Sequence, residues 1–157
     1  MKLEILPTAI VDTREQRPFQ FQNLPVERGT LTTGDYSVKG LEDRVAVERK
    51  DMDDLLACCG HGRERFKREL HRLQSYRFRL LIVEASMAEL EAGLSRSKLQ
   101  PAHVLGALAA WIAQYELPIM LVTGHVVAAR FTERFLYQAA RTVWKESEAL
   151  RKMMPML

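Results

Sequence analysis

The sequence contains little cysteine, no long apolar run and only a small excess of positive charge. The 2 cysteines, Cys58 and Cys59, are adjacent, whereas a disulfide framework needs cysteines that are spaced along the chain. Structural zinc needs four ligands in separated pairs, and a second pair that could join Cys58, Cys59 and His61 is missing. These absences exclude a disulfide-stabilised scaffold and a zinc finger, and they indicate a reducing, cytosolic compartment.

The hydropathy of the chain is equally restrictive. No run of about 18 apolar residues could form a membrane-spanning helix, and the N-terminus lacks the pattern of a signal peptide, so we expect no membrane partner. Apolar residues make up 47% and charged residues 27% of the 157 positions, which is ordinary for one globular domain over 1–157. The net charge of +3 does not by itself indicate a nucleic-acid partner, so the placement of the charges matters more.

The centre of the chain predicts a β-hairpin with charged side chains. Two β-type runs, 30–38 and 44–50, flank a turn of about five residues. Side chains alternate between the faces of a strand, so Glu48 and Lys50 share one face, and Asp35 on the partner strand comes close to them. Two carboxylates can hold a hard cation, which activates a water, and a lysine can stabilise the charge that develops on a phosphate.

The simpler interpretation of this hairpin is a surface element whose charges face the solvent. For an isolated Glu-x-Lys pattern that interpretation is the more common one, because half-buried strands normally alternate polar and apolar residues. The neighbouring segments favour the functional interpretation. An apolar run over 5–11 predicts a buried first strand, and Asp12, Arg14 and Glu15 follow at its end. We expect Asp12 to add a carboxylate and Arg14 to bind a phosphate, while Glu15 is either functional or part of a local salt bridge.

A basic segment follows the hairpin. After a short acidic-capped helix over 51–59, a glycine break leads into a helix over 63–77. Phe66, Leu70 and Leu73 form its core stripe, and the cationic side chains on its other faces include Arg63, Arg65 and Arg68. A basic helix is often only a solvated surface. Here its start directly after the hairpin favours contact with a DNA backbone.

The remaining elements predict an α/β domain. We expect a connector over 16–29, a buried strand over 79–85 and a short helix over 86–92 with a Ser86–Glu89 capping box. A polar, basic connector over 94–98, a helix over 101–116, a strand over 118–123 and a long helix over 126–152 follow. This order predicts a mixed central sheet with helices on both faces. The apolar faces of the last two long helices, which carry Trp111 and Trp144, are wide enough to suggest a homodimer.

The charged motifs resemble one known family. Gly34-Asp35, then Glu48-Arg49-Lys50 and then Asp54 three residues further on resemble the GD…ERKxxxD signature of XPF-type structure-specific DNA nucleases. The segment 11–15, Val-Asp-Thr-Arg-Glu, is similar to that family's first-strand motif, and Gly62-Arg63 stands where the family begins a basic helix. The motifs cover roughly residues 9 to 85, and the rest agrees in the order of its elements.

The resemblance implies a restriction-endonuclease-like fold and a metal-dependent DNA endonuclease that cuts flaps, forks or other branched and junction DNA. The Mg²⁺ or Mn²⁺ ligands would be Asp35 and Glu48, with the Val47 carbonyl and Asp12. Lys50 would stabilise the phosphate or position the water. The implied contacts to the DNA backbone are Arg14, Arg49, Arg63, Arg65 and Arg68. Asp54 and Glu15 would orient these site residues without binding the metal themselves.

One departure and two alternatives accompany this assignment. Family members often carry a helix-hairpin-helix module after the nuclease domain, and no such module is expected here. Selectivity for junctions would then come from dimerisation or from a partner protein, or would not exist, and the chain could be a domain cut from a longer protein. The alternatives are a non-catalytic DNA-binding scaffold and a nuclease that acts on the ends of linear duplexes. The presence of Asp35, Glu48 and Lys50 argues against the scaffold. We expect a nucleoid-associated protein in a prokaryote or a nuclear one in a eukaryote.

Overall fold

The computed structural model describes residues 6–94 and 98–154. Over these residues the chain forms one sheet of six strands in the order β2-β1-β3-β4-β5-β6. The strands are β1 (Ala9–Asp12), β2 (Val26–Gly29), β3 (Tyr36–Val38), β4 (Val45–Lys50), β5 (Phe78–Val83) and β6 (Ile119–Leu121). The strand β3 is antiparallel to both β1 and β4, whereas the β1–β2, β4–β5 and β5–β6 pairs are parallel. The expected mixed sheet is therefore confirmed.

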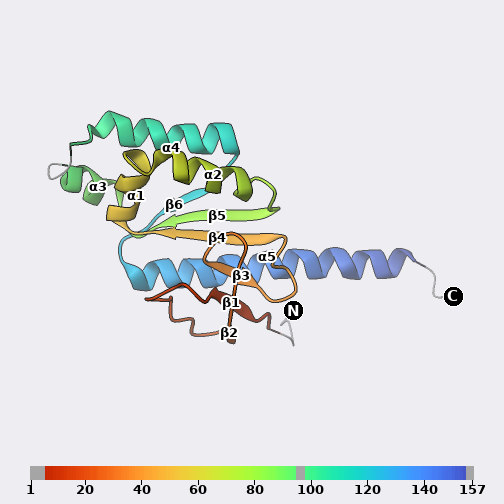
Figure 1. Cartoon of the computed structure of the whole chain (residues 1–157). Coiled ribbons are helices and arrows are strands. Elements are labelled where there is room, and N and C mark those ends of the chain that lie inside the picture. Colours follow the sequence, from red (N-terminus) through yellow and green to blue (C-terminus); the bar gives the residue numbers. More distant parts are fainter. Residues whose placement is uncertain (1–5, 95–97, 155–157) are drawn as a thin grey trace.

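Helices cover both faces of this sheet, as predicted (Figure 1). They are α1 (Met52–Cys59), α2 (Arg63–Leu73), α3 (Met87–Leu94), α4 (Pro101–Tyr115) and α5 (His125–Met153). Alternation along β4 separates two cores: Ala46 packs with α1, α2 and α4, while Val45 and Val47 pack with α5. The same alternation sends Glu48 and Lys50 to the α2 side and Arg49 to the α5 side.

Several boundaries differ from those expected. The hairpin exists, but only Tyr36–Val38 of the run over 30–38 is a strand, because the chain before it turns through Gly34. The helix expected over 63–77 ends at Leu73, where the chain turns and buries Tyr76. The predicted Ser86–Glu89 capping box is confirmed, since the Ser86 N–H donates to Glu89 Oε2 at 2.7 Å and the Glu89 N–H donates to Ser86 Oγ at 3.1 Å.

The connector expected over 16–29 contains an unpredicted edge strand, β2. Its residues are largely exposed, including the apolar Val26 at 45%, because an edge strand needs neither a buried face nor a second partner. Most of the connector expected over 94–98 lies outside the described residues. Within the described residues, no helix combines the length and the apolar character needed to cross a membrane.

Candidate active site

The turn before β3 brings Asp35 between two strands. Gly34 has φ +81°, and a Cβ at this position would lie 3.1 Å from the Val47 carbonyl oxygen, so only glycine fits without strain. This close approach lets the Asp35 N–H donate to Val47 O at 2.8 Å, while Asp35 O accepts from the Asp12 N–H at 2.9 Å. Asp35 Oδ2 accepts from the Arg49 N–H at 2.8 Å. The Gly-Asp motif thus fixes one carboxylate against the end of β4.

Glu48 and Lys50 lie on the α2 side of β4, as alternation predicted. Glu48 is 7% exposed, and Lys50 Nζ is 3.1 Å from Glu48 Oε1. The Lys50 ammonium also lies over the ring of Phe66 on α2, 5.3 Å from its centroid. Glu48 and Lys50 therefore lie side by side where the end of β4 meets α2.

A cavity of about 260 Å³ joins these groups. Its walls include Asp35, Glu48 and Lys50 on the strand side, and Arg65, Glu69 and Arg72 on the α2 side. These helix positions are spaced by four and three residues and therefore form one helix face. We call this space the catalytic cavity, after the role predicted from the sequence for Asp35, Glu48 and Lys50.

Burial and mutual repulsion make the two acids of the catalytic cavity costly to ionise together. Burial, and then the charge of Asp35, raise the pKa of Glu48 above its ordinary value. Burial, and then the charge of Glu15, raise the pKa of Asp35. Burial opposes the charge of Lys50, but the carboxylates of Glu48 and Glu69 outweigh it and raise the pKa of this lysine. A pair of acids with raised pKa values beside a lysine is typical of a functional site.

This pair of carboxylates fits a magnesium-type cation. Among the residues that the structure describes, no group of three or more His, Cys, Asp or Glu side chains forms a complete ligand cage. Mg²⁺ is usually held by one or two carboxylates, with waters and substrate phosphates as its other ligands. A cation there would offset the repulsion that raises both pKa values. Asp35 and Glu48 are therefore the ligands that the geometry offers.

Asp12 lies at the edge of the catalytic cavity, with both carboxylate oxygens engaged. Oδ1 accepts from the Leu31 N–H at 2.9 Å, and Oδ2 accepts from Arg14 Nε at 2.7 Å. Burial opposes ionisation, but these partners lower the pKa of Asp12 overall. The side chain of Arg14 is 69% exposed at the rim, where a phosphate could reach it. The carbonyl of Val47 is likewise engaged, because it accepts the Asp35 N–H. The ligand roles implied for Asp12 and Val47 remain predictions.

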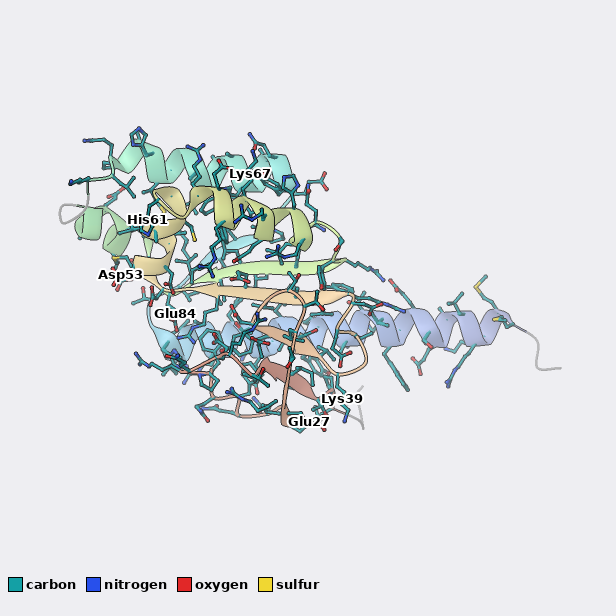
Figure 2. All side chains as sticks on the ribbon, viewed as in Figure 1. Glu27, Lys39, Asp53, His61, Lys67 and Glu84 are labelled. Carbon is teal, nitrogen blue, oxygen red and sulfur yellow. The ribbon has the colours of Figure 1, made fainter. Side chains whose placement is uncertain are left out.

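Arg49 lies on the opposite face of the sheet, away from Glu48 and Lys50. Its side chain is 13% exposed and contacts Glu15 Oε2 at 2.9 Å and Glu84 Oε2 at 3.1 Å. Figure 2 shows Glu84 beside the end of β4, near the start of α1. His125 Nδ1, at the start of α5, completes the network 2.6 Å from Glu84 Oε1. Arg49 on β4 therefore links this strand to Glu84, which follows β5, and to the loop that carries Glu15.

The basic residues predicted on α2 divide between two surfaces. Arg65 lines the catalytic cavity and Arg68 is exposed, whereas Arg63 lines a separate groove between α2 and α4. Asp54 is in the first turn of α1 and lines a second cavity on the Arg49 side. Sequence analysis did not identify Glu69 and Arg72 as site residues. Helical spacing could have identified them, because Arg65, Glu69 and Arg72 each stand one position before a residue of the core stripe and therefore share one helix face.

Comparisons with known proteins agree with this geometry. The family model of the ERCC4 domain matches residues 11–135. XPF from Aeropyrum pernix has a similar fold, with a TM-score of 0.69 and 22% identity over 96% of this chain and 75% of that chain. The structure described as XPF from Aeropyrum pernix in complex with DNA gives a TM-score of 0.62 and 23% identity over 87% of this chain and 66% of that chain. No curated protein sequence matches. Since the family model spans most of the sequence, the chain belongs to the ERCC4 domain family, that is, to the XPF-type nuclease domains.

Proposed function

We propose that the chain is a divalent-cation-dependent DNA endonuclease that hydrolyses phosphodiester bonds at flaps, forks or other branched and junction DNA. The observation that carries the proposal is the buried Asp35–Glu48 pair with Lys50 beside it in one cavity, bordered by Arg65 and Arg72. Membership of a nuclease family supports the reaction class.

The side chains of the catalytic cavity would have three different roles: to bind the cation, to stabilise charge on the phosphate and to contact the DNA backbone. Asp35 and Glu48 would hold Mg²⁺ or Mn²⁺, which when bound supplies an activated water and stabilises charge on the phosphate. Lys50 presents its ammonium where a phosphate would enter, because Glu48 and the Phe66 ring hold it at the cavity wall. It would stabilise negative charge as the phosphodiester is attacked. Arg14 at the rim and Arg65 on the opposite wall are placed to contact the backbone.

DNA binding is proposed from the placement of charge. Two exposed arginines of α2, Arg65 and Arg72, border the catalytic cavity, and such a pair can neutralise phosphates without reading bases. The structural likeness to a protein in complex with DNA supports the same partner. Selectivity for junctions would then depend on how two duplex arms reach the cavity.

We also propose that the chain acts as a homodimer. The second half of α5 extends beyond the sheet (Figure 1), and it carries Trp144 at 41%, Leu150 at 59% and Met153 at 78% exposure. A helix that exposes apolar side chains beyond its own domain offers a surface for a second subunit. A protein partner on the same surface would be the other source of junction selectivity.

The experiment is a cleavage assay with one labelled strand presented as a flap, a fork, a nicked duplex and a plain duplex. Each substrate is incubated with Mg²⁺, Mn²⁺ or EDTA. We expect cleavage of the branched substrates with either cation and none with EDTA. Cleavage only at the ends of the plain duplex would contradict the branched substrate and favour a nuclease that acts on duplex ends. No cleavage of any substrate would favour a non-catalytic module.

A further inference from the structure

Glu69 on α2 has an unusual environment for an acid on a basic helix. Its Oε2 is buried and lacks a hydrogen-bond partner among the residues that the structure describes. Arg65 and Arg72 lie one helical turn away on either side, at the spacing where salt bridges form on a helix surface. Glu69 nevertheless has its ion pair with Lys50, across the catalytic cavity. A buried carboxylate oxygen without a hydrogen bond is costly, so its position needs a reason.

Lys50 lies between two carboxylates at unequal distances. Its Nζ is 3.1 Å from Glu48 Oε1 and 3.9 Å from Glu69 Oε2. The first distance is that of a close ion pair, while the second is too long for a hydrogen bond. The ammonium is therefore committed to Glu48 and only attracted by Glu69. A small movement of this flexible side chain would exchange the two partners.

This exchange matters because Glu48 has two competing roles. As a cation ligand it must give up at least part of its pairing with Lys50. If Lys50 then lost its close carboxylate partner, its ammonium would be free to leave the catalytic cavity. We propose that Glu69 is a positioning residue that receives the Lys50 ammonium when Glu48 turns to the cation, which keeps the lysine beside the scissile phosphate. This role rests on the proposed function, and it accounts for the orphan Oε2.

The test is a double-mutant cycle read by calorimetric titration of Mn²⁺ without DNA. The variants are Glu69→Gln, Lys50→Met and the double variant, with Glu64→Gln as the control. Glu64 is an exposed acid on the same helix outside the catalytic cavity, so its variant carries the same charge change. Glutamine is nearly isosteric with glutamate, and thermal melting checks that each variant is folded.

We expect Glu69→Gln to weaken Mn²⁺ binding about fivefold, the size of one partly exposed ion pair, because Lys50 then stays on Glu48. In the Lys50→Met background the same change should weaken binding less than about twofold, since there is no ammonium to hand over. Equal weakening in both backgrounds would make Glu69 a direct ligand or a through-space charge and overturn the proposal. Unchanged binding by Glu69→Gln would also overturn it.

Single-turnover cleavage gives a second readout. Glu69→Gln should lower the rate at saturating DNA about tenfold and leave the half-saturating DNA concentration unchanged, because a misplaced lysine affects the reaction and not DNA binding. Glu69→Asp keeps the charge and should recover most of the rate. Equal losses in both variants would contradict a charge-based role. Wild-type protein that neither binds Mn²⁺ nor cleaves DNA would instead refute the proposed function, and this role with it.

Discussion

Replacing Glu48 by glutamine should stabilise the metal-free protein while it abolishes cleavage. Glu48 is buried, and its pKa is raised from 4.5 to about 8. The folded state therefore holds the proton more tightly than the unfolded state, so the wild type loses stability as the pH rises from the ordinary pKa towards the raised one. Glutamine carries no charge at any pH and avoids this cost.

The size of the effect follows from the same linkage. At about 1.4 kcal/mol for each pH unit above the ordinary pKa of 4.5, the buried charge costs up to ~4 kcal/mol at about pH 7.5. This cost already includes the attraction of Lys50, and relaxation of the protein around the buried charge offsets part of the gain. We expect a net stabilisation of about 1–3 kcal/mol near pH 7.5, which corresponds to roughly 3–8 °C in melting temperature for a chain of this size.

The assay is thermal and urea unfolding of wild type and Glu48→Gln between about pH 4.5 and pH 8, in EDTA and in Mg²⁺. The two proteins should be equally stable at the acidic end and separate as the pH rises. Mg²⁺ should stabilise the wild type alone, because only the wild type retains both ligands. The control is Glu64→Gln, which should follow the wild type. A Glu48→Gln variant that is less stable at every pH would refute the assigned burial cost.

Three further predictions concern DNA, chemistry and the fold. Joint replacement of Arg65 and Arg72 by alanine should weaken binding of all DNA sequences alike and reduce the salt slope by about two; an unchanged slope would exclude this helix face as a phosphate contact. Lys50→Ala should lose most cleavage yet keep Mn²⁺ binding in calorimetry, since an ammonium cannot ligate a cation; loss of Mn²⁺ binding would contradict its role. Glu133→Gln should lower the free energy of unfolding by about 2 kcal/mol, measured in urea, because Glu133 Oε1 accepts the Asn23 and Leu24 N–H groups. These bonds lower the pKa of Glu133 although burial opposes them, so the difference should vanish only as the pH falls through this lowered pKa.

Local patterns in the sequence were sufficient to predict the parts of the site that depend on short-range geometry. Alternation along β4 placed Glu48 and Lys50 on one face and Arg49 on the other, and the structure has this arrangement. The turn through Gly34 was not predicted, because the run over 30–38 was interpreted as one strand, and its tightness follows from the positive φ of Gly34. The alternation itself needs only the period of a strand, which is visible in the chain.

Long-range contacts could not be predicted in the same way. The partners of Arg49 include Glu84 and His125, which come from the end of β5 and the start of α5, and sequence spacing does not reveal which helix N-terminus meets which strand. The network around Arg49 was therefore missed, and the arginine was assigned to DNA on its motif alone. Glu69 was missed because it appeared as one acid in a basic helix, and only the packing of α2 against β4 brings it to Lys50.

The central claim is that Asp35 and Glu48 hold the cation that cleaves DNA, and Asp35→Asn tests it most directly. Asparagine keeps the shape of the side chain but removes the charge that binds the cation. Single-turnover cleavage of a labelled flap substrate in Mg²⁺ should fall by several orders of magnitude, while DNA binding in EDTA should hold or rise slightly as one negative charge near the phosphate is lost. Cleavage by Asp35→Asn at the wild-type rate would contradict the account.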